Sequence, residues 1–323
     1  MFTRSPEQYQ KLNFFEADIA NTSYVRMMKS VKLPTSGTKY RYAINSPSES
    51  GKPYLLFLHG FPESSYSWIN QIEYFTRRGY GIIAPDLLGT GGTDKPVELE
   101  AYSLKMMASE VAGLLDSLVF MDIGYFAPGV DVNMTYVETY NNISEAEVGY
   151  PALGYWYYYD QPDGHVLMDE HLDSFYSLIY SFNTPTDWIE HIAKIGASQE
   201  WLAADRMAEY GNDYITNSAR ERWKTITQAQ GGVQAAQRWY EALLRGINSE
   251  DEDEVRSMSG IIEQPSLLIG ADRDPVGLPA RQLMATLPYA PRMQVKSVDS
   301  RYFLLIEQAD EVNEHLYKFL QSL

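Results

Sequence analysis

The chain has 323 residues, of which 45% are hydrophobic and 21% charged, and it carries a net charge of −17. This length suffices for one large core with an insertion or for two modest domains, and the composition excludes a disordered or collagen-like chain. The sequence contains no cysteine and its five histidines show no ligand spacing, which excludes a disulfide scaffold, zinc fingers and iron–sulfur clusters.

Short apolar runs in the first 122 residues alternate with helix-like patterns. The run 39–45 alternates like an early antiparallel strand, and the later runs are typical of strands buried on both faces. The predicted strands are 39–45, 54–58, 81–85 and 118–122, and the predicted helices are 65–78 and 102–118. Such an alternation predicts a mostly parallel α/β sheet flanked by helices.

The sequence becomes aromatic and helix-prone from about residue 128. We expect residues 128–247 to form a helical lid, and residues 1–127 and 248–323 to form the α/β core. The acidic run 249–254 predicts a solvated loop. Beyond it the pattern predicts two strands and a closing helix, at 266–270, 293–297 and 309–322.

The charge and the tyrosine content limit the partners of the protein. Its negative surface repels phosphate backbones and anionic lipid, so we expect no nucleic-acid or membrane partner. The sequence has no apolar run of membrane-spanning length and its first residues lack a secretion signal, so we expect a cytoplasmic protein. No cofactor or metal is expected. The 25 tyrosines predict aromatic pockets for a small-molecule substrate.

A series of motifs runs in order from about residue 37 to the end of the chain. His59-Gly-Phe-Pro62 follows an apolar run, and APDLLGTGGTDKP comes next at 84–96. Further motifs are FMDIGYFAPG at 120–129, LGYWYYYDQP at 153–162, QRWYEALLRGIN at 237–248 and IGADRDPVGLP at 269–279. Together they resemble the epoxide hydrolase branch of the α/β-hydrolases, especially its fungal members. The resemblance implies an α/β-hydrolase fold with a helical lid.

The resemblance also implies a mechanism. In that family an aspartate on a sharp strand-to-helix turn opens the epoxide, and a histidine oriented by an acid activates the water that hydrolyses the ester. Two lid tyrosines hydrogen-bond the epoxide oxygen as charge develops on it. By motif, these tyrosines are Tyr155 and Tyr240, and the orienting acid is Asp274.

Two further groups of residues follow from the same resemblance. The oxyanion loop, whose backbone N–H groups face the reacting centre, corresponds to His59, Gly60, Phe61 and Pro62. Two tryptophans beside the lid tyrosines, Trp156 and Trp239, are expected to line the substrate pocket.

The sequence departs from the family at two points. Neither a Gly-x-Ser-x-Gly nor a His-Asp-Trp-Gly elbow occurs, and the helix predicted to end at Leu118 runs directly into the next strand. A strand–elbow–helix unit, on the order of thirty to forty residues, is therefore missing. Tyr302 stands where the family carries its histidine. A phenol with an ordinary pKa of about 10 does not activate water at pH 7 as imidazole does.

We therefore expect a non-hydrolytic enzyme, in which the lid tyrosines polarise the epoxide of an apolar, natural-product-like substrate that supplies its own hydroxyl. Tyr302 and Asp274 are candidates for a hydrogen-bonded pair that acts as a weak base or simply forms a wall of the substrate pocket. The alternatives are a catalytically inactive pseudo-hydrolase and a residual epoxide hydrolase. Asp122, in Asp122-Ile-Gly124, echoes the lost turn, but family members carry a similar motif there without a nucleophilic role.

Overall fold

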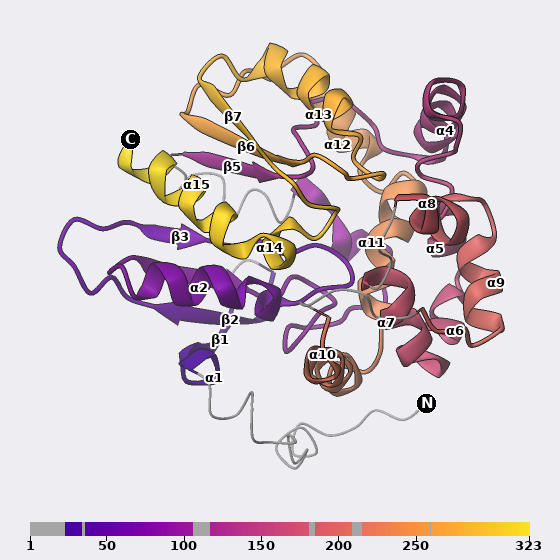
Figure 1. The fold of residues 1–323 in the computed structure, drawn as a ribbon, viewed down its shortest axis with the longest axis horizontal. Helices are drawn as coiled ribbons and strands as arrows, with labels where there is room; N and C mark the ends of the chain where they lie inside the picture. The colour runs from indigo at the N-terminus through magenta and orange to yellow at the C-terminus, as the bar shows by residue number, and fades with distance from the viewer. Residues whose placement is uncertain (1–22, 34–35, 106–116, 181–184, 209–214, 259) are drawn as a thin grey trace. The chain divides into compact units, whose positions relative to one another are not determined.

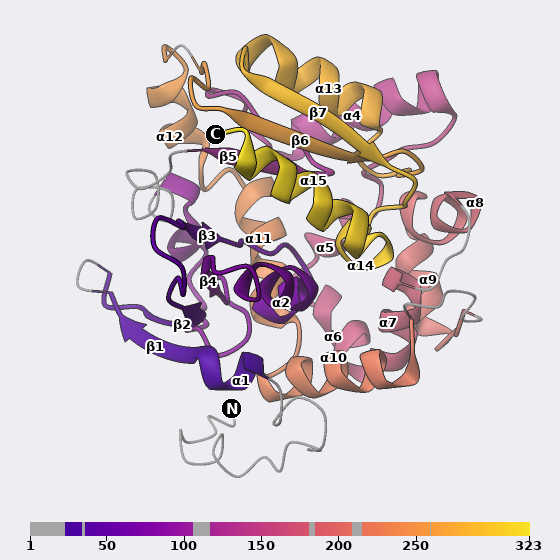
Figure 2. The ribbon, with the colours of Figure 1, turned by 60° about the vertical axis from the view of Figure 1, so that its left-hand side comes forward.

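The computed structural model describes the whole chain apart from residues 1–22, 34–35, 106–116, 181–184, 209–214 and 259. The chain divides into two compact units. Unit 1 comprises Met1–Val97 and Ile215–Gln237, and unit 2 comprises Glu98–Tyr214 and Arg238–Leu323. Each unit holds its own β-sheet (Figures 1 and 2).

The sheet of unit 1 has four strands in the order β1-β2-β4-β3. They are β1 (Met28–Lys32), β2 (Lys39–Asn45), β3 (Tyr54–Leu56) and β4 (Gly81–Pro85). The pairs β1–β2 and β2–β4 are antiparallel, whereas β3 and β4 are parallel. Helix α2 (Ile69–Thr76) packs on β4. Its Phe75 joins Phe57 and Trp68 in the core, where the rings of Phe57 and Trp68 stack at 5.0 Å.

The sheet of unit 2 has three parallel strands in the order β5-β6-β7. They are β5 (Leu118–Met121), β6 (Ser266–Ala271) and β7 (Met293–Val298). The central strand β6 is an apolar run that is buried along almost its whole length, as a strand paired on both sides requires. The C-terminal helix α15 (Ala309–Gln321) packs against β6 and β7.

Several of the remaining helices of unit 2 lie to one side of its sheet (Figure 1). The longest of them, α4 (Met134–Val148), begins where the Asn133 side chain accepts the Tyr136 N–H and ends at Gly149, whose positive φ of 87° is typical of a helix stop. The others are η3 (Leu99–Tyr102), α5 (Trp156–Tyr159), α6 (Gly164–Glu170), α7 (Leu172–Tyr180), α8 (Pro185–Trp188), η5 (Ile189–Ala193), α9 (Ala197–Ala203), α12 (Ser249–Val255), α13 (Pro279–Thr286), η6 (Leu287–Tyr289) and α14 (Leu304–Glu307).

Four helical segments complete the element order. Unit 1 also contains α1 (Ser23–Met27), η2 (Ser65–Trp68) and α10 (Asn217–Ala229), while α11 (Gln234–Leu244) begins in unit 1 and continues into unit 2. None of the described helices is long and apolar enough to cross a membrane.

Most of the predicted elements are confirmed, with two differences. The predicted strand 54–58 is only the three-residue β3, and it forms the edge of its sheet with Tyr54 48% exposed. It is therefore not the doubly buried strand that its apolar sequence suggests. Most of the predicted helix 102–118 lies outside the described residues. The division into core 1–127 with 248–323 and lid 128–247 stays a prediction.

The second difference concerns the acidic run 249–254, which forms α12 and not a loop. Three acidic residues lie in its first turn, where the positive end of the helix dipole favours them. Lys105 Nζ lies 3.0 Å from Asp251 Oδ1 and also pairs with Glu254. The ion pairs and the dipole together offset the mutual repulsion that made a solvated loop the expected structure.

Candidate functional site

The two lid tyrosines predicted from the motifs lie together in unit 2. Tyr155 immediately precedes α5 and Tyr240 lies within α11, and their ring centroids are 6.4 Å apart at 71°. An ion pair at the ends of these helices, Arg245 Nε to Asp160 Oδ1 at 2.9 Å, fixes α11 against α5. Tyr159 also stacks edge-on against Tyr240 at 4.9 Å.

Both hydroxyls remain protonated across the neutral pH range. Burial raises the pKa of Tyr155 to about 12, against the opposing effect of a hydrogen bond with Tyr240. Burial also raises the pKa of Tyr240 well above its ordinary value, with smaller contributions from Tyr155, Tyr159 and Tyr302. The cluster is thus a pair of neutral O–H donors in an aromatic surrounding, which is the requirement for stabilising an oxyanion without losing a proton to water.

Asp274 lies three residues beyond the end of β6 and is 4% exposed. Its carboxylate accepts backbone N–H groups from Val276, at 2.9 Å, and from Gly277. Burial nevertheless raises the pKa of Asp274 to about 6. The carboxylate also contributes to the raised pKa of Tyr155, so the predicted acid and the predicted tyrosine share one electrostatic environment.

A second buried carboxyl, Asp122, contacts Asp274. Asp122 directly follows β5, is 5% exposed, and lies close enough to Asp274 for the two carboxyl groups to form a hydrogen bond when one of them is protonated. Burial first, and then the neighbouring Asp274, raise the pKa of Asp122 well above its ordinary value. Glu307 of α14 adds a third negative group nearby, and it is held by Arg301 through an Nε–Oε2 contact of 3.2 Å.

The other predicted residues of unit 2 lie around this centre. Tyr302 is half-buried, packs edge-on against Phe303 at 4.9 Å, and is close enough to Tyr240 to influence its pKa. Trp156 packs against Tyr240 at 5.1 Å, whereas Trp239 packs against Tyr102 at 5.6 Å. Unit 2 therefore brings together Tyr155, Tyr240, Asp274 and Tyr302, the four residues predicted to be catalytic.

The predicted oxyanion loop belongs to unit 1 and is held by its own hydrogen bonds. His59 is buried; its Nε2 accepts the Leu87 N–H at 3.0 Å, so Nδ1 carries the proton and donates to Gly60 O at 2.8 Å. Burial lowers the pKa of His59, which keeps the ring neutral. Gly60, Phe61 and Pro62 follow it, with a cis peptide bond between Phe61 and Pro62.

Close to this loop, unit 1 buries the carboxylate of Asp86, which follows β4. Its Oδ1 accepts the N–H of Ser65 at 3.1 Å and the hydroxyl of Ser65 at 2.5 Å, and its Oδ2 accepts the Gly92 N–H at 2.9 Å. This carboxylate is surrounded by donors. It ties the loop after β4 to the turn that precedes α2.

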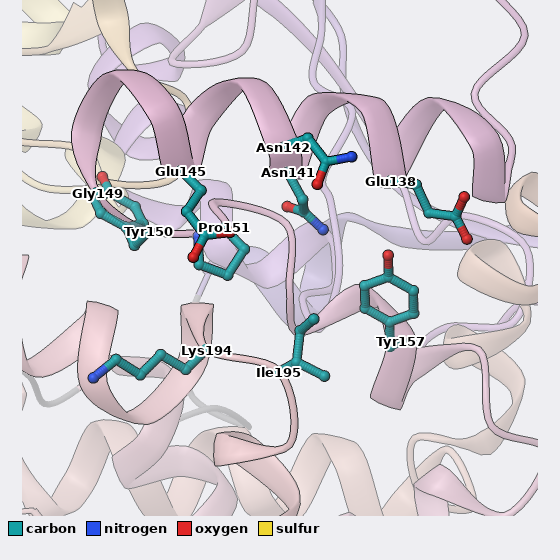
Figure 3. A pocket seen from close by; sticks show the side chains of 10 residues that line it. All are labelled: Glu138, Asn141, Asn142, Glu145, Gly149, Tyr150, Pro151, Tyr157, Lys194 and Ile195. Atoms are coloured by element: carbon teal, nitrogen blue, oxygen red, sulfur yellow. The ribbon is translucent and has the colours of Figure 1, made fainter.

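A separate pocket of about 460 Å³ lies against α4 in unit 2. Figure 3 shows Tyr157 pointing its hydroxyl toward α4 from the opposite wall. The lining residues are Glu138, Asn141, Asn142, Glu145, Gly149, Tyr150, Pro151, Tyr157, Lys194 and Ile195. None of the residues predicted to be catalytic lines it, so this pocket and the tyrosine cluster are distinct features.

One feature of the site was not predicted from the sequence, namely the role of Asp122 as the partner of Asp274. The available signal was its place directly after a strand, in an Asp-x-Gly sequence typical of a tight turn. Within the described part of the chain, no group of three His, Asp or Glu side chains is arranged to hold a metal ion.

Comparison with known proteins agrees with this architecture. Residues 53–120 match the family model of the alpha/beta hydrolase fold. The chain is 38% identical over 86 residues to epoxide hydrolase A of Mycobacterium tuberculosis, which is 27% of this chain and 26% of that protein. The matched stretch thus spans about a quarter of the length of that curated relative.

Solved structures of epoxide hydrolases are similar over most of the chain. Epoxide hydrolase A of Mycobacterium thermoresistibile gives a TM-score of 0.70 at 20% identity, covering 91% of this chain and 98% of that one. An epoxide hydrolase of Vigna radiata gives 0.70 at 17% identity, covering 94% and 100%. These matches establish the α/β-hydrolase fold.

Proposed function

We propose, from a chain that has the α/β-hydrolase fold and resembles epoxide hydrolases in sequence, that this protein opens an epoxide in an apolar, natural-product-like substrate without consuming water. The observation that carries the proposal is the hydrogen-bonded pair of Tyr155 and Tyr240 in an aromatic cluster. Two neutral phenols beside each other are suited to hold one epoxide oxygen and to stabilise it as it becomes an alkoxide.

The reaction is an isomerisation. A hydroxyl oxygen of the substrate attacks one epoxide carbon, the carbon–oxygen bond of the epoxide at that carbon breaks, and a new ring ether forms. The hydroxyl proton leaves to a base, and the new alkoxide gains a proton, so the product has the same composition as the substrate. The site needs only to fold the substrate into near-attack geometry and to stabilise the oxyanion.

Two features of the sequence support this reaction over hydrolysis. The chain carries neither of the nucleophile elbows of the hydrolases, and Tyr302 occupies the position of the family histidine. Without a covalent ester and a base that activates water, the tyrosine pair retains only its effect on the epoxide oxygen. That effect is sufficient where the substrate provides the nucleophile.

The experiment uses an aryl-substituted 4,5-epoxy alcohol as probe, in water enriched in ¹⁸O. We expect a cyclic ether that is isomeric with the probe and carries no ¹⁸O. A diol that carries one ¹⁸O atom would identify a residual epoxide hydrolase and overturn the proposal. Binding of the probe without any change of its mass or connectivity would identify a pseudo-hydrolase, and it too would overturn the proposal.

Substitution of the tyrosines tests their role. Tyr155→Phe and Tyr240→Phe each remove one donor from the epoxide oxygen and should lower kcat about 100- to 1000-fold, the range seen for loss of one oxyanion donor. Tyr157→Phe is the matched control, because Tyr157 lies in the same aromatic run but lines the pocket against α4. Equal activity in all three variants would remove the tyrosine pair from the mechanism.

A further inference from the structure

Two carboxyl groups meet at the carboxyl ends of neighbouring parallel strands. Asp122 follows β5 and Asp274 follows β6, and these strands pair directly, with Met121 opposite Ile269. The ends of adjacent parallel strands are the place where α/β folds assemble functional side chains. The two carboxyl groups lie close enough to form a hydrogen bond when one of them is protonated.

The backbone holds both groups in position. Asp122 has a φ of 66°, one of three non-glycine residues with positive φ among the described residues, and such a conformation costs roughly 1–3 kcal/mol. Its N–H donates to Ile269 O at 2.8 Å. On the other side Gly277 leaves room for Asp274, since a Cβ on Gly277 would lie 2.6 Å from Oδ2 of Asp274.

The pair has fewer donors than its oxygens require. Asp274 accepts two backbone N–H groups, whereas Oδ1 of Asp122 accepts a long contact of 3.4 Å from Ala271 N. Oδ2 of Asp122 is buried and accepts no N–H or O–H from the described residues. A hydrogen bond between two carboxyl groups requires a proton on one of them. One shared proton therefore supplies the missing donor.

The groups that face the pair come from several elements. Glu307 of α14 approaches it with its charge compensated by Arg301. Tyr150 donates its hydroxyl to Pro275 O at 2.9 Å, next to Asp274. Tyr155 and Tyr140 both have their pKa raised in part by Asp274, so the carboxylate lies near the tyrosines. These phenols are neutral, and Glu307 adds negative charge.

We propose that Asp122 and Asp274 share one proton and form the acid–base group of the tyrosine site, with Asp274 as the base and Asp122 as its positioning residue. This inference rests on the proposed epoxide opening. Asp274 takes the proton from the attacking hydroxyl of the substrate, while Tyr155 or Tyr240 gives its proton to the new alkoxide. The pair then returns a proton to the phenolate through solvent, so that the catalytic cycle consumes no net proton.

The electrostatics of the pair agree with this assignment. Burial raises the pKa of Asp274 to about 6, which makes its carboxylate a stronger base than an exposed one yet leaves it ionised at pH 7. Burial and the charge of Asp274 raise the pKa of Asp122, and interaction with Asp274 favours the protonated form of Asp122, so Asp122 carries the shared proton. Two neighbouring buried carboxyl groups do not both ionise in the same pH range.

The first test is the pH dependence of kcat/KM with the epoxy alcohol probe. The unsubstituted protein should gain activity as the pH rises through about 6, the pKa of Asp274. Asp274→Asn should lower kcat/KM at least 100-fold. Asp122→Asn should retain activity with the rise near the same pH, because its amide replaces the protonated carboxyl as the donor to Asp274. Asp122→Leu removes this donor and should move the rise to higher pH by about one unit or more.

The matched control is Asp272→Asn, since Asp272 lies in the same loop but is exposed. It should keep both the rate and the pH profile of the unsubstituted protein. Near-UV circular dichroism establishes that each variant is folded. If Asp274→Asn and Asp122→Leu both match the control on a protein that converts the probe, the inference is wrong while the proposed function stands.

A second test does not depend on turnover. Infrared spectroscopy at pH 7 should show the C=O band of a buried protonated carboxyl, which disappears in Asp122→Asn and persists in Asp272→Asn. Absence of this band in the unsubstituted protein would overturn the shared proton whatever the activity. A band in a protein that never converts the probe would overturn the catalytic assignment together with the proposed function.

Discussion

Each unit buries an aspartate just beyond the end of a strand, Asp86 after β4 in unit 1 and Asp122 after β5 in unit 2. The two are equally inaccessible, at 4% and 5% exposure. Asp86 is surrounded by N–H and O–H donors from Ser65 and Gly92. Asp122 faces a second carboxyl group, Asp274, and one of its oxygens has no described donor.

The two aspartates differ in the groups that surround their carboxyl groups and not in how deeply they are buried. A buried carboxylate with several donors is stabilised in its charged form and fixes the local backbone. A buried carboxyl that faces another carboxyl can be accommodated only with a proton between them, which costs stability at neutral pH and leaves a group ready to exchange that proton. We therefore interpret Asp86 as structural and the Asp122–Asp274 pair as functional.

The largest effect expected from this comparison is the loss of Asp86. Asp86→Ala leaves the N–H and hydroxyl of Ser65 and the N–H of Gly92 buried without their acceptor. The free energy of unfolding of unit 1 should fall by about 3–5 kcal/mol. Chemical denaturation, with hydrogen exchange of β2 and β4 as the local probe, measures this loss.

The control is Asp94→Ala, since Asp94 is exposed and its side chain accepts the Lys39 N–H at 2.8 Å. It should change the free energy of unfolding by about 1 kcal/mol or less. Equal effects of the two substitutions would show that the donors around Asp86 do not distinguish it from a surface aspartate.

The next effect is the pH dependence of the stability of unit 2. The pKa of Asp274 rises from the ordinary 3.8 to about 6 on folding, so the stabilisation is complete below pH 4 and is lost as the pH increases through 6. At about 1.4 kcal/mol per pKa unit, the loss from this group is about 3 kcal/mol. Denaturation of the protein between pH 4 and pH 8 measures it.

Asp122→Asn should stabilise unit 2 at pH 7 by about 1–3 kcal/mol, because a neutral amide does not have to take up a proton on folding, as Asp122 does with its raised pKa. A destabilised Asp122→Asn protein at pH 7 would mean that the pair behaves like Asp86. In that case the proposed contrast between the two buried aspartates would be lost.

Much of the fold could be predicted from short sequence patterns. The apolar runs at 81–85 and 266–270 predicted β4 and β6, because a strand covered on both faces must be apolar throughout. The run at 54–58 is also largely apolar, yet β3 lies at the edge of its sheet. Whether a strand is central or at the edge depends on which strand pairs beside it, and no local pattern carries that information.

The residues of the candidate site could be predicted where they lie in sequence motifs that resemble a known family. Tyr155, Tyr240 and Asp274 were identified by their resemblance to a family, and the structure places them in one unit. The partnership of Asp122 with Asp274 depends on the pairing of β5 with β6 and on a left-handed turn at Asp122. Both are tertiary properties of residues that are 152 positions apart in the sequence.

A smaller effect is expected at the glycine that accommodates the pair. Gly277→Ala places a methyl group 2.6 Å from Oδ2 of Asp274 and should lower the free energy of unfolding of unit 2 by about 1–3 kcal/mol. Gly270→Ala, in β6, is the control because its Cβ would meet no atom within 4 Å. Thermal unfolding should separate the two, and matching transition temperatures would show that Asp274 has room to move.

The smallest effect is expected from His59, a single group that titrates in the opposite direction to the carboxyl pair. Burial lowers its pKa below the ordinary 6.5, so unit 1 keeps its full stability above pH 6.5 and loses it as the pH falls. The ring must lose its bond from the Leu87 N–H to accept a proton on Nε2. The stability of unit 1 should therefore fall toward acid pH, where unit 2 is most stable.

His59→Gln retains an acceptor near Nε2 and should abolish the loss of stability of unit 1 at acid pH, whereas His165→Gln in unit 2 should leave that loss unchanged. Hydrogen exchange of β4 and β6 amides at pH 5.5 and 7.5, corrected for intrinsic rates, compares the two units in one sample. If both sheets lose protection in the same direction, the buried groups do not control the pH response and the contrast between the units is wrong.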